Sequence, residues 1–270
     1  MHAGLHVNDC TLSLATKERT YLFPLWLFPD SEASASIDHS AARPNLSAKF
    51  LARLAVALGL PQQGVHGLPR GLKPEDIFDY AYAVLHSPGY RSRYAEFLKS
   101  DFPRLPLIGD IGLFRSLTRL GNELVALHLL ESDKVARRGS KFLGRGRGIS
   151  KVTWSANNAG TVWIDGNSAA NDRGTSGFSG VPEAVWNFRV GGYQVCEKWL
   201  KDRKGRTLSD DDITHYNKIV IVLTETMRLM KEIDEVIERH GGWPAAFETD
   251  AEPTLEEQPS LLEVAEPWAK

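Results

Sequence analysis

The residues with the clearest chemical potential are the arginines of an Arg–Gly stretch, Gly144-Arg145-Gly146-Arg147-Gly148. Glycine lets the backbone come close to a partner, and the planar guanidinium can donate paired hydrogen bonds to phosphate oxygens or to guanine O6 and N7. A dinucleotide-binding glycine loop would need a strand before it and a helix after it, which this stretch lacks. The stretch therefore predicts nucleic-acid contacts by Arg145 and Arg147, and the alternative is a flexible surface loop that contacts nothing.

A second basic constellation begins at Gly191-Gly192-Tyr193 and ends with Lys201–Arg206. The paired glycines permit a tight turn, and a helix predicted from Tyr193 to Lys201 would offer its first amides to an anion. Tyr193 could donate to a phosphate or stack. The basic residues after the helix could grip a second phosphate. The alternative is an ordinary Gly-Gly turn followed by a solvated cationic helix end, which the helix dipole favours anyway.

No catalytic or metal-binding constellation stands out. The eight histidines never pair at metal-ligand spacing, and two cysteines cannot by themselves make a disulfide framework or a four-ligand zinc site. Asp210-Asp211-Asp212 could hold a metal ion, but at a helix start the triplet is better explained by capping and by the helix dipole. With no activated nucleophile or acid–base pair visible, we expect a chain that is not an enzyme.

Charge is distributed unevenly along the chain. Residues 248–270 hold seven acids and one base, so the formal net charge of −2 leaves +4 for the remainder. Lys134–Lys151 contains seven bases and no acid, and Lys198–Arg206 contains five bases and one acid. Such clusters indicate a polyanionic partner. Since there is no 18-residue apolar run and no secretory signal at Met1–Leu14, we expect no membrane span and a cytoplasmic protein.

Helices and one hairpin must position these residues. Tyr21–Phe28 reads as a buried strand interrupted by Pro24. Val152–Trp154 and Thr161–Asp165 predict a hairpin, flanked by mobile Gly-rich loops. Helices are expected at residues 45–58, 74–85, 88–98, 110–128, 182–186, 193–201 and 209–241. The expected fold class is α+β, mainly helical, with a small β-sheet or hairpin region and a long C-terminal helix.

Several separated segments resemble the C-terminal specificity domain of type ISP restriction–modification enzymes. They agree in order over roughly residues 20–236 and include Pro74–Pro88, Tyr94–Pro106, Leu124–Leu130 and Val190–Arg206. In that family one polypeptide joins a nuclease, a helicase-like motor, an adenine-N6 methyltransferase and this domain. The resemblance implies that the domain holds DNA in register while the methyltransferase flips an adenine out of the stack.

The resemblance also implies a division of the chain and a set of partners. Residues 1–44 resemble the end of a methyltransferase module plus a linker, 45–245 form the DNA target-recognition domain, and 246–270 form an acidic, disordered tail. The partners are double-stranded DNA and the methyltransferase, helicase and nuclease modules of the same system. No Asn-Pro-Pro-Tyr motif, S-adenosylmethionine loop or P-loop occurs, so we expect a separate or truncated piece without a cofactor, and S-adenosylmethionine would bind the missing methyltransferase.

Each predicted contact is assigned to base reading or to backbone grip. Arg145 and Arg147 lie in a stretch that is longer and less regular than the resemblance implies, so they are expected to read bases. The full predicted DNA-binding set is Arg145, Arg147, Lys151, Asn187, Gly191, Gly192, Tyr193, Lys201, Arg203, Lys204 and Arg206. Two alternatives stay open: a non-specific module that binds DNA or RNA, and a remnant that docks onto a methyltransferase without touching DNA.

Overall fold

The computed structural model describes residues 23–28, 42–99, 101–137, 139–166, 173–190, 192–248 and 259–265. The chain forms two compact units. The terminal unit comprises the described residues up to Val125 and from Leu229 onward, and the central unit comprises Ala126–Arg228. The division falls inside two helices, α4 (Ile111–His128) and α7 (Asp210–Arg239).

The terminal unit is mainly helical, with one two-stranded ladder. Besides parts of α4 and α7, it contains β1 (Trp26–Leu27), β2 (Arg43–Pro44), α1 (Ala48–Ala57), η2 (Val65–Gly67), α2 (Pro74–His86), α3 (Pro88–Arg93), η3 (Phe97–Lys99), η7 (Ala245–Phe247) and α8 (Leu261–Val264). Local capping explains several of these bounds: Ser47 accepts from the Phe50 amide to begin α1, and Ser87 accepts from the Tyr90 amide to begin α3. The helix expected over 88–98 is shorter in the structure. Helix α3 ends at Arg93, and Phe97–Lys99 form the separate helix η3.

In the terminal unit, helices α2 and α4 cross at very short range. The rings of Tyr80 and Phe114 lie 5.0 Å apart between centroids, and both side chains are buried. At the crossing, Gly121 of α4 lies against the backbone of Asp79, so that a Cβ on residue 121 would overlap the Asp79 carbonyl oxygen. Asn122 donates to the Asp79 carboxylate at 3.0 Å. Burial is the main reason that the pKa of Asp79 rises to about 6.

We expect Gly121→Ala to lower the free energy of unfolding by about 1–3 kcal/mol, because the added methyl must push the two helices apart. The intrinsic helix preference of alanine offsets only about 1 kcal/mol of this cost. Gly112→Ala in the same helix is the matched control, since its Cβ would meet only the end of the Asp110 side chain, at 3.0 Å. Urea denaturation of both variants measures the difference, and equal stabilities would contradict this packing.

Two expectations for the ends of the chain need correction. Of the buried strand expected at Tyr21–Phe28, only Trp26–Leu27 is paired within the described residues, and Trp26 and Phe28 are exposed because the ladder with β2 is only two residues long. The disordered tail expected at 246–270 is wrong for Pro259–Ala265. There, Leu105 donates its amide to the Pro259 carbonyl at 2.9 Å and Val264 is buried, so backbone pairing and apolar burial order the segment.

The central unit contains an antiparallel four-stranded sheet in the order β3-β6-β5-β4. Its elements are η4 (Asp133–Ala136), β3 (Lys141–Leu143), β4 (Thr153–Ser155), η5 (Asn157–Ala159), β5 (Thr161–Trp163), β6 (Gly177–Ser179), α5 (Glu183–Trp186), β7 (Arg189–Val190), β8 (Tyr193–Gln194) and α6 (Val195–Lys201). The predicted hairpin is confirmed as β4–β5. Strands β3 and β6 lie in Gly-rich stretches that were expected to be loops, because three-residue strands are too short to show a period.

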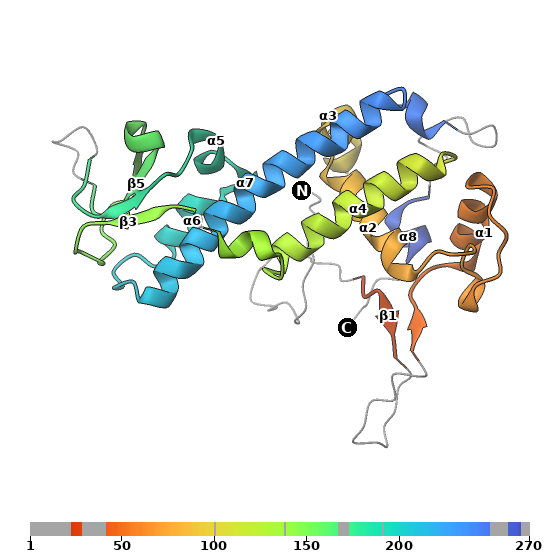
Figure 1. Cartoon of the computed structure of the whole chain (residues 1–270), viewed down its shortest axis with the longest axis horizontal. Helices are drawn as coiled ribbons and strands as arrows, with labels where there is room; N and C mark the ends of the chain where they lie inside the picture. Colours follow the sequence, from red (N-terminus) through yellow and green to blue (C-terminus); the bar gives the residue numbers. More distant parts are fainter. Residues whose placement is uncertain are drawn as a thin grey trace, which may run out of the picture. The chain divides into compact units, whose positions relative to one another are not determined.

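One face of this sheet forms the core of the central unit. The strand register aligns Phe142, Phe178, Val162 and Trp154 in one row across the four strands. The Phe178 ring lies 4.3 Å from the ring of Tyr216, so the first half of α7, drawn in blue in Figure 1, packs against this row. Burying these large apolar side chains stabilises the unit and fixes the loops at the edges of the sheet.

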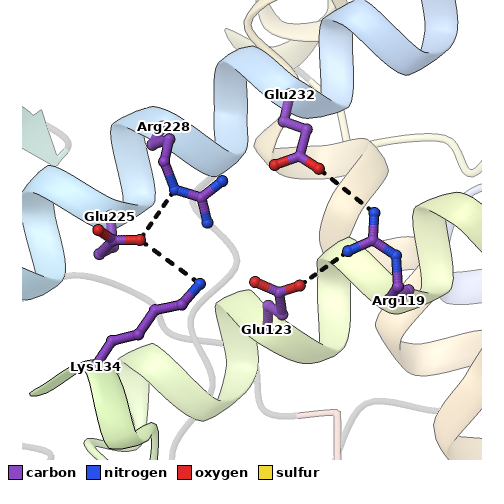
Figure 2. A network of polar contacts seen from close by, with 6 residues as sticks. All are labelled: Arg119, Glu123, Lys134, Glu225, Arg228 and Glu232. Atoms are coloured by element: carbon purple, nitrogen blue, oxygen red, sulfur yellow. Dashed lines mark hydrogen bonds and ion pairs between the residues drawn. The ribbon is translucent and has the colours of Figure 1, made fainter.

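Figure 2 shows ion pairs that tie α7 to its neighbours within each unit. In the central unit Glu225 contacts Arg228 at 3.0 Å and Lys134 at 3.6 Å, and in the terminal unit Arg119 contacts Glu123 at 2.9 Å and Glu232 at 3.4 Å. Burial raises the pKa of Glu225, but its two cationic partners bring it below its ordinary value. Among the described residues, no helix is both long and apolar enough to span a membrane.

Candidate nucleic-acid interface

The two basic segments predicted from the sequence lie side by side in the central unit. Leu208 donates its amide to the Arg147 carbonyl at 2.9 Å, Ile149 donates to Arg206 at 3.3 Å, and Gly205 donates to Ile149 at 3.0 Å. These bonds run antiparallel, with Gly148 bridging Thr207. Residues 144–151 and 201–208, which we call the basic strip, are therefore one continuous piece of surface, although 49 residues separate them in the chain.

Apolar burial explains why the two segments meet. Ile149 and Leu208 are 3% and 2% exposed, and both belong to the core of the central unit. Each is flanked by polar residues and glycines that have no place in a core. Burying the two aliphatic side chains therefore draws both segments to the rim of the core and leaves their neighbours, Arg145 and Arg206 among them, exposed.

The glycines of the Arg–Gly stretch serve packing within the unit. Gly144 has a φ of +79°, which favours glycine, and a Cβ there would overlap the Thr175 carbonyl oxygen. Gly146 donates its amide to Ser176 Oγ at 3.0 Å. A Cβ on Gly148, in contrast, would meet nothing within 4 Å. The structure thus assigns two of the three glycines to contact with residues 175–176.

The two arginines of this stretch differ in their surroundings. Arg145 is exposed and has no ion-pair partner in the described part of the chain. Arg147 pairs with Asp210 at 2.7 Å, and its side chain is 40% exposed. Arg145 is therefore available to a ligand in the conformation seen here. Arg147 could bind a ligand only by keeping Asp210 as a second partner or by breaking its ion pair with Asp210.

The cations of the second segment also divide into paired and available groups. Lys201 pairs with Glu197 at 2.9 Å. Lys204 and Arg206 are exposed and make no ion pair with any described residue. Arg203 points inward: its guanidinium carbon lies 3.6 Å from the Trp199 ring centroid, and its Nε donates to Asp212 at 3.3 Å. Arg203 therefore joins the end of α6 to the start of α7.

Replacing Arg203 by alanine is expected to lower the free energy of unfolding by on the order of 1–2 kcal/mol, since it removes a cation–π contact and a charged hydrogen bond. The neighbouring substitution Lys204→Ala should change it by less than about 0.5 kcal/mol, because that side chain is exposed. Thermal and urea unfolding of the pair tests this difference. Equal effects would show that Arg203 has no structural role.

The glycine-pair constellation is built differently from its prediction. Helix α6 begins at Val195, because Tyr193 pairs with Val190 in the β7–β8 hairpin, so the expected helix start at Tyr193 is wrong. Gly191 lies outside the described residues, and the exposed Gly192 accepts from Arg189 at 3.1 Å. Tyr193 is 57% exposed, with Lys198 Nζ 5.3 Å from its ring centroid. The exposed aromatic side chain is present, but the first amides of α6 follow Tyr193 and do not include that of Gly192.

The two remaining predicted contacts, Lys151 and Asn187, are both exposed. The Lys151 carbonyl accepts from Gly166 at 3.0 Å, which places Lys151 beside the segment after β5. Asn187 Oδ1 accepts from Gln194 at 3.1 Å, which ties Asn187 to the β7–β8 hairpin. Lys151 therefore extends the basic strip, and Asn187 belongs with the hairpin.

The acidic triplet at the start of α7 does what capping predicts. Asp212 accepts from the Ser209 amide at 3.0 Å, and the Asp212 amide donates to Ser209 Oγ at 3.0 Å, which completes a capping box. Asp210 and Asp212 also hold Arg147 and Arg203. Nowhere in the described ranges do three or more His, Cys, Asp or Glu side chains gather as a metal site.

The central unit carries the positive charge of the chain. Residues 126–228 contain 16 Lys and Arg against 11 Asp and Glu, a net charge of +5. Because the whole chain has a net charge of −2, the remaining residues carry −7. Two exposed cations of this unit, Arg173 and Arg189, were missed by the sequence analysis because they stand alone outside a basic run. The charge that a polyanion would require is thus concentrated in one folded unit.

Comparison with known proteins identifies the family. The family model for the Type ISP C-terminal specificity domain matches residues 3–232. A comparison with curated proteins finds no match. The ATP-dependent Type ISP restriction–modification enzyme LlaBIII bound to DNA is similar in fold, with a TM-score of 0.55 and 16% identity over 78% of this chain and 14% of that one. The DrdV–DNA complex gives a TM-score of 0.54 and 22% identity over 77% of this chain and 21% of that one.

These comparisons cover most of the present chain but only a small part of the two large proteins. The chain spans between 14% and 21% of their length. The family match covers the central unit and the part of the terminal unit up to residue 232. This chain belongs to the family of Type ISP C-terminal specificity domains.

Proposed function

We propose that this chain is the non-catalytic recognition part of a restriction–modification system and reads the sequence of double-stranded DNA in the cytoplasm. The observation that carries the proposal is the basic strip, which two distant segments form by backbone pairing on the one unit with a positive net charge. A duplex is a dense polyanion, so a continuous strip of cations on a rigid core suits it. The family match and the DNA-bound neighbours support the same conclusion.

The cations of the basic strip differ in exposure and in ion pairing, and these differences suggest different roles for them. Lys204 and Arg206 are exposed and unpaired among the described residues, which suits contacts with phosphates. Arg145 is equally available and lies on a loop held against the sheet, which suits reading of a base edge. Arg203, in contrast, is occupied by Trp199 and Asp212, so we move it from the predicted phosphate contacts to a supporting role.

The catalytic modules of such a system would be other parts of a longer protein or separate chains. The structural neighbours are five to seven times longer than the matched region, which leaves room in them for further modules. We propose that the methyltransferase, helicase and nuclease are the partners of this chain and that S-adenosylmethionine binds to the methyltransferase. Adding such a methyltransferase to this chain should restore site-specific adenine methylation.

Selection of duplexes from a randomised pool by the full chain tests the proposed function. Sequencing of the retained DNA should reveal one enriched motif, and duplex RNA should not compete for binding. Retention of all sequences alike would indicate a non-specific module, and retention of none would favour a role in docking onto the methyltransferase. Either of those results would overturn the proposal.

A further inference from the structure

A carboxylate outside the basic strip holds the segment on which the Arg–Gly stretch rests. Asp165, just after β5, accepts hydrogen bonds at Oδ1 from the backbone amides of Thr175 and Ser176, each at 3.0 Å. Its Oδ2 accepts from the Thr175 hydroxyl at 2.6 Å. Burial raises the pKa of Asp165, but these hydrogen bonds bring it below its ordinary value, so the carboxylate is charged at neutral pH.

The segment held by Asp165 in turn holds the Arg–Gly stretch. Ser176 is 1% exposed, and its hydroxyl oxygen accepts the Gly146 amide at 3.0 Å. Gly144 lies so close to Thr175 that no Cβ fits between them. A continuous set of short contacts therefore runs from Asp165 through residues 175–176 to the backbone on either side of Arg145.

The charge of Asp165 has the same sign as that of the proposed ligand. The Asp165 backbone is bridged to Lys151 of the basic strip, so its negative charge lies near the surface proposed to receive phosphates. A carboxylate there weakens the attraction of the strip for any nucleic acid. Its three donors are neutral groups, so their hydrogen bonds do not cancel the charge. The hydrogen bonds of Asp165 would outweigh this loss of attraction if they hold the loop in the geometry that DNA binding needs.

We propose that Asp165 is a positioning residue for sequence discrimination, which sets the orientation of Arg145 through Thr175 and Ser176. The inference rests on the proposed function, because it assigns a purpose to a base-reading loop. A guanidinium reads a base edge only when its fork is held at a defined angle, so loss of the support should reduce discrimination before it reduces general affinity.

Two variants weaken the support, and two matched controls accompany them. Asp165→Asn keeps the shape but removes one acceptor, and Thr175→Val removes only the hydroxyl donor. Thr175→Ser retains that hydroxyl. Asp211→Asn removes an exposed acid of the same unit that has no part in the contacts described here, so it reports the effect of charge alone. The readouts are affinity for a selected duplex, affinity for a scrambled duplex, and hydrogen exchange of the Gly146 amide.

The proposal predicts that Asp165→Asn and Thr175→Val lower the ratio of selected to scrambled affinity about tenfold, which corresponds to about 1.4 kcal/mol. Gly146 should exchange faster in both variants, while Thr175→Ser and Asp211→Asn keep the ratio of the parent protein. The proposal is wrong if Asp165→Asn and Asp211→Asn have the same ratio of selected to scrambled affinity and the same exchange rate of the Gly146 amide. If Asp165→Asn does not fold, Thr175→Val decides the matter by the same two criteria.

If the proposed function is wrong, the same experiments give a different result. In that case the unmodified chain would show no preference for any duplex, whatever the variants do. The exchange of the Gly146 amide needs no DNA, so it still reports whether Asp165 positions the loop. Faster exchange without any discrimination in the parent protein would leave Asp165 as a structural residue and overturn its assignment to specificity.

Discussion

Removing Lys204 and Arg206 together is expected to weaken binding to every duplex alike by about tenfold or more, because each removes a charged contact with a phosphate. The slope of log affinity against log salt should become shallower by about 2, since each phosphate contact contributes about 0.9. The side chains are exposed, so the free energy of unfolding should change little. Fluorescence anisotropy at four or more salt concentrations measures both quantities.

A two-charge control comes from the terminal unit. Lys231 and Arg239 are exposed residues of α7 beyond the division between the units, and their joint replacement by alanine removes the same total charge. If the basic strip receives the phosphates, this control leaves the salt slope nearly unchanged. An equal change of slope in both double variants would mean that only net charge matters, and the strip would lose its assigned role.

Replacing Arg145 by alanine is expected to reduce discrimination at one position of the recognised sequence. A bidentate contact with a base edge contributes about 1–3 kcal/mol of discrimination, or roughly 5- to 150-fold. Affinity for unrelated duplexes should fall much less than affinity for the selected site. Competition between the selected duplex and its single-base variants identifies the position that has lost its preference.

The substitution Arg145→Lys separates charge from geometry at the same residue. Lysine keeps the positive charge but lacks the planar fork, so the salt slope should be retained while discrimination falls. A uniform loss of affinity for all duplexes in Arg145→Ala, fully restored by lysine, would show that Arg145 contacts phosphate and not a base.

Local sequence signals predicted the parts of the fold that depend on near neighbours. The helix expected over 209–241 begins where Ser209 and Asp212 form a capping box, and the β4–β5 hairpin follows from short β-type runs on either side of Asn157 and Gly160. Helix α2 begins at Pro74, as expected, because proline suits the first position of a helix and Glu75 and Asp76 suit its positive end. Each of these features is decided within a few residues.

Features that depend on distant contacts could not be read from the sequence. Strands β3 and β6 become strands only because Phe142 and Phe178 pair across 36 residues. The inward direction of Arg203 depends on Trp199 and on Asp212 together, and no local pattern distinguishes it from Lys204. The role of Asp165 requires knowledge that residues 175–176 lie beside it. In each case tertiary packing, and not propensity, decides the outcome.

Lysine footprinting tests the central claim, that duplex DNA lies on the basic strip, most directly. The full chain is treated with an amine-acetylating reagent, with and without its selected duplex, and modification is quantified by mass spectrometry at each lysine. We expect DNA to protect Lys201 and Lys204, while Lys49 and Lys231, which are exposed in the terminal unit, react as before. Protection of Lys49 and Lys231 without protection of Lys201 and Lys204 would contradict it.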